Sequence, residues 1–353
     1  MARKTLLAAL LAALTALIVA APAAAVPPSF YGMVPQIGPT HDEFTRMGQG
    51  QVGSYRWPLS WRGIEQTKGV YTFDGTDTLM TELAMNGMKP VPFVCCPPAF
   101  IHEDERKPPT GAAEEKAYTE WLTAVMKRYG RGGDFWAENP GLPENPITDV
   151  QIFNEPNSSS FYHPKPDAAE YAHLLEISSK AIHDVDPGAF IVLAGMFGTP
   201  HPADGKAIDA WKFLAKLYKH GAKPFFDSAA SHPYSGNLAG IKFQIKKFRK
   251  VMKENGDSGA DIWITEMGWG SKKHVASPLG KGKKGQARIL KKSFKLLKKK
   301  RNNWNIHGIM WFTFKDHDDP TFCTWCDSAG LFSKAFKAKP AWKQYVKFTG
   351  GTP

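Results

Sequence analysis

The sequence has no long apolar stretch after residue 25, few cysteines, and fewer acidic than basic residues. A membrane-spanning helix needs about 20 consecutive apolar residues, and every later segment of that length contains charges. With 4 cysteines among 353 residues the chain is not a disulfide-dense scaffold, and a core of this size does not need one. These deficits argue against an integral membrane protein and against a small cystine-rich module.

The first 25 residues have the pattern of a secretory signal peptide. Arg3 and Lys4 precede an apolar run over residues 6–20, and small residues follow at 23–25. The run is too short for a typical membrane span, although an uncleaved anchor is the alternative interpretation. The pattern predicts a secreted, extracellular protein whose signal peptide covers residues 1–25 and whose mature part is residues 26–353.

The four cysteines lie in two pairs. Cys95 and Cys96 are neighbours, and side chains of neighbouring strand residues point to opposite faces, so these two are poorly placed to ligate one metal ion. Cys323 and Cys326 form a C-x-x-C without the second pair that would complete a zinc site. A local disulfide and free thiols both remain open for this pair, and we expect neither a metal nor a cofactor.

The excess of 45 Lys and Arg over 33 Asp and Glu is concentrated in one segment. Lys281–Arg301 holds eleven basic residues and no acidic one. Ala287, Leu290, Phe294 and Leu297 recur at helical spacing, which predicts one amphipathic helix with a cationic outer face. That face is either simply solvated or attaches the protein to an anionic cell envelope or acidic polysaccharide. Nucleic acid is not indicated, because the segment lacks interleaved exposed aromatic residues.

Short β-rich runs alternate with segments of helical periodicity, which predicts parallel strands joined by helices. Runs such as Ile191–Leu193 are apolar at consecutive positions, as in strands buried on both faces. An open doubly wound sheet would need a phosphate-binding glycine loop after Tyr31–Met33, and none is present. We therefore expect a single-domain α/β protein, a (β/α)8 TIM barrel. The expected strands are 30–34, 51–57, 89–94, 149–154, 189–195, 227–232, 261–266 and 307–312, and the expected helices are 42–47, 77–86, 113–129, 167–185, 207–220, 241–255, 287–299 and 341–348.

Two of the expected strands end in glutamate, at the position where barrel enzymes carry their catalytic groups. Glu155 follows the fourth strand and Glu266 ends the seventh. These strands face one another across a barrel mouth, so two carboxylates can approach one sugar from opposite sides. Glycosidic cleavage requires such a pair, one protonated and one ionised. The pattern predicts a catalytic pair, whereas either glutamate alone would indicate only a partner in a surface salt bridge.

The motifs around these strands resemble the clan of (β/α)8 retaining glycoside hydrolases, in which the acid/base follows strand four and the nucleophile ends strand seven. Within the clan the sequence is most similar to family 39-type bacterial enzymes, with the family 5 cellulase-like enzymes second. Besides Asn154-Glu155-Pro156, the likeness rests on Tyr55-Arg56-Trp57, Trp61, Ile64-Glu65, Gly69-Val70-Tyr71, Tyr129-Gly130, Phe135-Trp136, Asn139-Pro140 and Ser231-His232-Pro233-Tyr234.

The resemblance implies roles for individual residues. Asn154 would bind the substrate 2-hydroxyl, and Arg56 would hold Glu266 ionised and oriented. His232 or Tyr234 would hydrogen-bond the carboxylates. Trp311, at the end of strand eight, would supply a flat apolar face for a sugar ring. One departure is Phe153, where many relatives carry tryptophan.

Together these features predict a secreted retaining glycosidase acting on a polysaccharide or oligosaccharide, either β-xylosidase-like or endo-β-glycanase-like. The alternative is a barrel that binds glycans without cleaving them. That alternative predicts loss of Glu155, Glu266 or Asn154, and all three are present.

Overall fold

The structure is a computed structural model, and it describes residues 26–273, 275–318 and 323–353. The expected signal peptide over residues 1–25 lies outside the described residues. Among those that are described, no helix combines the length and the apolar character that crossing a membrane requires.

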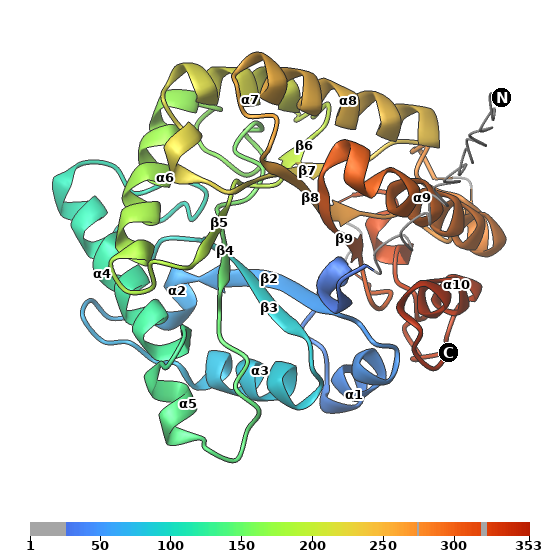
Figure 1. The fold of residues 1–353 in the computed structure, drawn as a ribbon, viewed down its shortest axis with the longest axis horizontal. Helices are drawn as coiled ribbons and strands as arrows, with labels where there is room; N and C mark the ends of the chain where they lie inside the picture. The colour runs from blue at the N-terminus through green and yellow to red at the C-terminus, as the bar shows by residue number, and fades with distance from the viewer. Residues whose placement is uncertain (1–25, 274, 319–322) are drawn as a thin grey trace, which may run out of the picture.

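The described strands are parallel and form one sheet that closes on itself (Figure 1). Their order around the ring is β5-β4-β3-β2-β1-β9-β8-β7-β6, and the pairing of Val192 in β5 with Ser228 in β7 closes it. β5 and β6 are two pieces of the fifth barrel strand, so the ring is an eight-stranded parallel barrel. The strands are β1 (Tyr31–Val34), β2 (Ser54–Ser60), β3 (Lys89–Cys95), β4 (Asp149–Ile152), β5 (Phe190–Val192), β6 (Met196–Phe197), β7 (Ser228–His232), β8 (Asp261–Met267) and β9 (Ile306–Phe312).

Helices surround this barrel on all sides, as the ring of coiled ribbons in Figure 1 shows. The predicted (β/α)8 TIM barrel is therefore confirmed. The helices are α1 (His41–Gln49), α2 (Trp61–Ile64), α3 (Asp74–Met85), α4 (Ala112–Tyr129), α5 (Asp134–Glu138), α6 (Ala168–His183), α7 (Ala210–Lys219), α8 (Leu238–Glu254), α9 (Gly282–Trp304) and α10 (Pro340–Thr349).

Local signals in the sequence determine where several helices begin. The Thr40 hydroxyl accepts from the Glu43 backbone N–H, and the Glu43 carboxylate accepts from Thr40 in return, which is a complete capping box on α1. Asp167 caps α6 by accepting from the backbone N–H groups of Ala169 and Glu170. Each cap satisfies donors that the first helical turn leaves unpaired.

The expected boundaries agree with the structure to within a few residues, with two kinds of exception. The short helices α2 and α5 were not expected, since a segment of four or five residues carries too little periodicity to be recognised. The fifth strand is interrupted between Val192 and Met196. This break lies beside β4, the strand that Glu155 follows, and contributes to the site described below.

Both cysteine pairs are disulfides. The Cys323–Cys326 bond resolves the alternative left open by the sequence. The Cys95–Cys96 bond was not expected, because side chains alternate along a strand. β3 ends at Cys95 and the backbone of Cys96 has a φ of 67°, so the chain turns out of the strand between the two cysteines.

Candidate active site

A cavity of about 490 Å³ opens at the carboxyl ends of the barrel strands. Its wall includes Val34 from the end of β1, Phe93 from β3, Phe197 from β6 and Phe312 from β9. Since parallel strands present their carboxyl ends at one face, residues far apart in the sequence meet there. Of the residues that the sequence assigned to the site, Arg56, Asn154, Glu155, Tyr234 and Glu266 line this cavity.

The two glutamates lie on facing sides of the cavity and close together. One carboxylate oxygen of Glu155 and one of Glu266 lie within 4.8 Å of each other. The backbone around the first is unusual, since Phe153 has a φ of 67° and Glu155 a φ of 45°. Residues other than glycine rarely adopt this left-handed backbone conformation. It costs of order 1–3 kcal/mol per residue, and residues that adopt it cluster at functional sites. The surrounding fold thus holds the Asn154-Glu155 turn in an unfavourable conformation.

Glu266 is held by a buried cation and a phenol. Nη1 of Arg56 donates to its Oε1 at 2.6 Å, and the Tyr234 hydroxyl donates to its Oε2 at 2.9 Å. The same guanidinium donates to Asn154 Oδ1 at 2.7 Å and, through Nε, to Gln151 Oε1 at 2.5 Å. Arg56 is fully buried, so every donor group that it extends toward the site is fixed. The two hydrogen bonds fix the orientation of the Glu266 carboxylate.

Glu155 occupies a different environment. It is 5 % exposed, and its Oε1 lies 2.6 Å from Nδ1 of His232, with which it forms a hydrogen bond. Burial raises the pKa of Glu155 well above its usual value, and the neighbouring charge of Glu266 adds to the effect. Burial also lowers the pKa of His232, which keeps the imidazole neutral. The surroundings of Glu155 therefore favour its protonated form.

His232 fits because the interrupted fifth strand brings a glycine beside it. A Cβ at Gly195 would lie 1.9 Å from His232 Nε2, so no other residue is tolerated there without movement. The Gly195 carbonyl also accepts from the backbone N–H of Glu155 at 3.0 Å. On its other side the imidazole Nε2 lies 3.0 Å from the hydroxyl of Thr265. The sequence gave no indication of the roles of Gly195 and Thr265.

Glu155, His232 and Glu266 each offer a ligand atom to the same small space, so they could in principle hold a metal ion. The hydrogen bonds argue otherwise. Both oxygens of Glu266 already accept from Arg56 and Tyr234, and the guanidinium supplies the positive charge that a metal would bring. The donor set is that of a hydrogen-bonded carboxylate pair.

The prediction for Trp311 is wrong. This side chain is fully buried and packs outward against Trp269 and against Phe294 of α9, with its indole N–H donating to the Ala329 carbonyl at 3.2 Å. It does not line the cavity. Successive side chains of a strand point to opposite faces, so the next residue, Phe312, points inward and lines the cavity instead.

A tryptophan from another segment supplies the aromatic wall. Trp325 lies in the segment after β9, within the Cys323–Cys326 disulfide, and all three residues line the cavity. Its ring centroid lies 5.2 Å from that of Tyr234 and 5.9 Å from that of Phe312. The sequence analysis missed Trp325, although its position inside a closed C-x-W-C loop is a recognisable signal.

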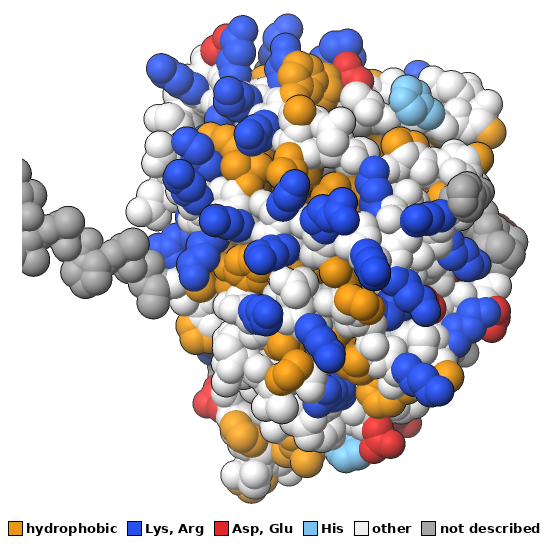
Figure 2. Space-filling view, turned by 90° about the vertical axis from the view of Figure 1, so that its right-hand side faces the viewer, with side chains coloured by type: hydrophobic (Ala, Val, Ile, Leu, Met, Phe, Trp, Pro, Cys, Tyr) orange, Lys and Arg blue, Asp and Glu red, His pale blue; other side chains and the backbone are white. Residues whose placement is uncertain are grey.

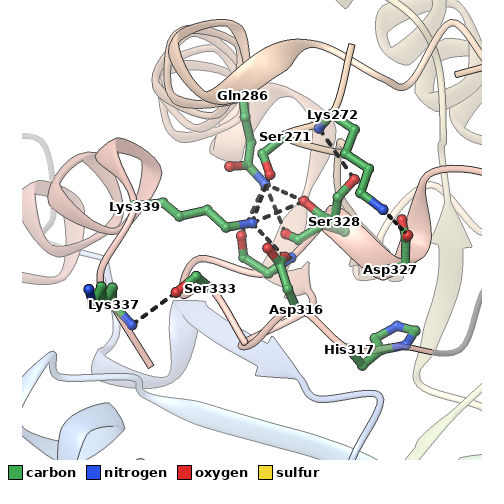
Figure 3. A network of polar contacts seen from close by, with 12 residues as sticks. Ser271, Lys272, Gln286, Asp316, His317, Asp327, Ser328, Ser333, Lys337 and Lys339 are labelled. Atoms are coloured by element: carbon green, nitrogen blue, oxygen red, sulfur yellow. Dashed lines mark hydrogen bonds and ion pairs between the residues drawn. The ribbon is translucent and has the colours of Figure 1, made fainter. Parts of the chain in front are cut away.

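A buried ion pair fastens the segment that follows Trp325 (Figure 3). Nζ of Lys339 lies 2.5 Å from Oδ1 of Asp316 and also donates to the Ser271 hydroxyl at 2.9 Å and the Ser328 carbonyl at 3.1 Å. Lys339 is 3 % exposed, and burial lowers its pKa. The network joins the segment after β8 to the segment after β9. It thereby fixes the position of the segment that contains Trp325.

Comparisons with known proteins agree with this geometry. Residues 114–336, more than half of the chain and including both glutamates, match the family model of the glycosyl hydrolase catalytic core. The search of curated protein sequences gave no match.

Solved structures share the fold at low sequence identity. A family 39 glycoside hydrolase from Bacteroides cellulosilyticus is similar with a TM-score of 0.68 and 19 % identity over 92 % of this chain and 64 % of that one. An exo-β-1,4-mannosidase from an Opitutaceae bacterium gives 0.63 and 14 % over 91 % and 59 %. Xylanase 10B from Thermotoga maritima gives 0.63 and 15 % over 92 % and 95 %. The chain thus spans less than two thirds of the first two relatives.

Proposed function

This chain belongs to the glycosyl hydrolase catalytic core family, and from that premise we propose that it is a secreted retaining glycoside hydrolase with Glu155 as acid/base and Glu266 as nucleophile. The observation that carries the proposal is the contrast between the two carboxyl groups. Glu155 is buried against a neutral imidazole, and its burial favours the protonated form that an acid requires, whereas Glu266 is held in place by hydrogen bonds from the Arg56 guanidinium and the Tyr234 hydroxyl.

The separation of the two carboxylates supports retention over inversion. Retaining enzymes hold their carboxyl groups about 5–5.5 Å apart, and inverting enzymes hold them ~6.5–9.5 Å apart to admit a water molecule. One carboxylate oxygen of Glu155 and one of Glu266 lie within 4.8 Å of each other, which is nearer to the separation in retaining enzymes than to that in inverting ones. This supports direct attack by Glu266 on the sugar.

The proposed reaction has two steps. Glu155 gives its proton to the glycosidic oxygen while Glu266 attacks the anomeric carbon, so the aglycone leaves and a covalent glycosyl-enzyme forms. Glu155, now ionised, then takes a proton from water, whose oxygen attacks the anomeric carbon and releases Glu266. Asn154, whose Oδ1 accepts from Arg56 at 2.7 Å, would bind the 2-hydroxyl beside that carbon.

The substrate is proposed from the shape of the site. The cavity is lined by Phe93, Phe197, Phe312 and Trp325, and it suits the C–H faces of one or two sugar rings. A β-linked polysaccharide or oligosaccharide, cleaved in a β-xylosidase-like or endo-β-glycanase-like manner, fits this lining. The signal-peptide pattern of residues 1–25 supports action outside the cell.

The cationic segment Lys281–Arg301 supports a second part of the proposal, contact with an anionic cell-envelope surface. In α9 the residues Ala287, Leu290, Phe294 and Leu297 are buried, which leaves the basic side chains on the outer face. Such a face attracts anionic surfaces in a salt-dependent manner.

The test of the proposed function is the stereochemistry of the first product. Proton NMR during hydrolysis of a panel of aryl β-glycosides is expected to show the β-hemiacetal before mutarotation. An initial α-product would establish inversion, and the absence of hydrolysis of every glycoside and polysaccharide tried would favour the glycan-binding alternative.

A further inference from the structure

One side of the molecule is strongly and almost exclusively cationic. Figure 2 shows this side, on which Lys and Arg side chains far outnumber acidic ones. Eight Lys and Arg side chains of α9 are exposed, among them Lys292, Lys295 and Lys299. In the part of the chain that the structure describes, none of these eight forms an ion pair with an acidic side chain.

The neighbouring helix continues this surface. α8 has six Lys or Arg and a single acidic residue, Glu254, which lies 3.5 Å from Lys250. α3, on the far side of the barrel in Figure 1, has three acidic residues and no basic one. The net charge of +12 is therefore concentrated on one side of the molecule. The α8–α9 side attracts anions more strongly than the same charge would if it were spread evenly over the surface.

An exposed aromatic pair adjoins the cations. Phe243 on α8 is 50 % exposed, and its ring meets that of Trp211 on α7 edge to face, with centroids 5.4 Å apart. Nζ of Lys247 lies 5.3 Å from the centre of the Phe243 ring. The core does not require Phe243, because α8 already buries Ile241, Ile245, Phe248 and Met252 against the barrel. Asp209, two residues before Trp211, forms an ion pair with Lys212 at 2.8 Å.

The position of this pair relates it to the catalytic cavity. In a (β/α)8 barrel each helix begins near the end of the strand that carries the cavity and runs back along the barrel. Trp211 and Phe243 both lie in the first two turns of their helices, so they are on the cavity side of the molecule. α8 packs against both α7 and α9, which makes the aromatic pair and the α9 cations parts of one continuous surface.

We propose that the outer faces of α7, α8 and α9 form a second binding site, separate from the catalytic cavity, for an acidic polysaccharide. Sugar rings would pack in the corner between Trp211 and Phe243, while the lysines of α8 and α9 bind carboxylates along the polymer. The inference rests on the proposed function for its sugar chemistry and extends the anionic contact of Lys281–Arg301 to a defined ligand. It does not depend on either glutamate.

Two features favour a polysaccharide over other polyanions and surfaces. A membrane surface would need several large apolar side chains protruding among the cations, whereas the exposed residues of α9 are all polar or charged and α8 exposes a single large apolar side chain, Phe243, among its described residues. Among the described residues that line the catalytic cavity, the one Lys or Arg is Arg56, which already donates to Glu266 and Asn154, so we expect the acidic groups of a polymer to bind elsewhere. A polymer that carries charge along its length would instead place it on the α8–α9 face.

The experiment measures binding to polygalacturonate by affinity electrophoresis, with dextran as the neutral polymer. The variants are the pair W211A/F243A and the triple K292Q/K295Q/K299Q, and the matched control is K116Q/K127Q/K180Q, whose lysines are exposed on α4 and α6. Wild type is expected to bind polygalacturonate and not dextran. Each test variant is expected to weaken binding by about tenfold, and raised salt to weaken it further, while the control changes it by less than about twofold.

Hydrolysis of a small aryl glycoside is measured for every variant, so that failure of this site and failure of the proposed catalytic function are distinguishable. Rates are expected to remain at the wild-type level. The proposal is overturned if the control weakens binding as much as the K292Q/K295Q/K299Q triple, because net charge would then account for it, or if W211A/F243A binds unchanged. Tighter binding to phosphatidylglycerol vesicles or to single-stranded DNA than to polygalacturonate would also overturn it.

Discussion

Nδ1 of His232 lies 2.6 Å from Oε1 of Glu155, and both side chains are almost completely removed from solvent. A neutral imidazole in this position can share a hydrogen bond with a protonated carboxyl group, but it supplies no positive charge to hold that group ionised. The relationship between these two residues therefore sets the pH range in which the site can donate a proton.

The first prediction concerns that pH range. Because burial raises the pKa of Glu155, kcat/KM on a natural glycan is expected to fall as the pH rises through this raised value. The folded chain binds this proton more tightly than the unfolded chain. Protonated Glu155 therefore contributes its full stabilisation below the pKa of an unfolded glutamate, and the free energy of unfolding falls as the pH rises from there through the raised pKa of Glu155. In Glu155→Gln the side chain cannot ionise, so unfolding midpoints across pH should lack this fall. Identical pH dependence in both proteins would contradict the assignment.

The second prediction concerns Arg56. Arg56→Lys keeps a positive charge but cannot reproduce the three contacts to Gln151, Asn154 and Glu266. We expect kcat to fall by about 100-fold or more, with a smaller change in KM, because the contacts orient groups that act in the transition state. Arg56→Ala should also unfold more readily, by about 3–5 kcal/mol, since it leaves buried acceptors unpaired. If Arg56→Lys kept wild-type kcat, Arg56 would be a structural ion pair.

The third prediction separates two tryptophans. Trp325→Ala is expected to raise KM on oligosaccharides by about tenfold, because it removes an aromatic wall of the cavity. Trp311→Ala removes a fully buried ring and is expected to lower the free energy of unfolding by about 3–5 kcal/mol. Its KM, measured below the unfolding transition, should be close to that of wild type. Steady-state kinetics and denaturant unfolding on both variants provide the comparison, and an exchange of the two phenotypes would show that the cavity wall is misassigned.

The barrel could be predicted from the sequence because its signal is repetitive. Each strand is a short apolar run followed by a helical period, and an error at one boundary does not disturb the rest. The same alternation placed Glu155 and Glu266 at strand ends, and a closed barrel brings the fourth and seventh of these together. Three further residues contact the glutamates because they too lie on barrel strands or directly after them: Arg56, His232 and Tyr234.

The remaining parts of the site depend on information that periodicity does not contain. Trp311 and Phe312 are adjacent, and successive side chains of a strand point to opposite faces. An error of one residue in placing the strand therefore exchanges the side chain that faces the cavity for the one that faces away. Trp325 comes from a segment without regular structure. The left-handed backbone at Phe153 and Glu155 is imposed by tertiary contacts, against the local preference of both residues.

The most direct measurement of the central claim is the configuration of the glycosyl azides formed by two alanine variants from an activated aryl β-glycoside. Glu155→Ala should still form the glycosyl-enzyme, release a burst of phenol, and give a β-glycosyl azide as azide displaces Glu266. Glu266→Ala should form no covalent intermediate, and azide entering the vacated space should give the inverted α-glycosyl azide. Opposite anomers from the two variants are the predicted result; the same anomer from both, or full activity of either variant on natural glycan, would contradict the assignment of Glu155 as acid/base and Glu266 as nucleophile.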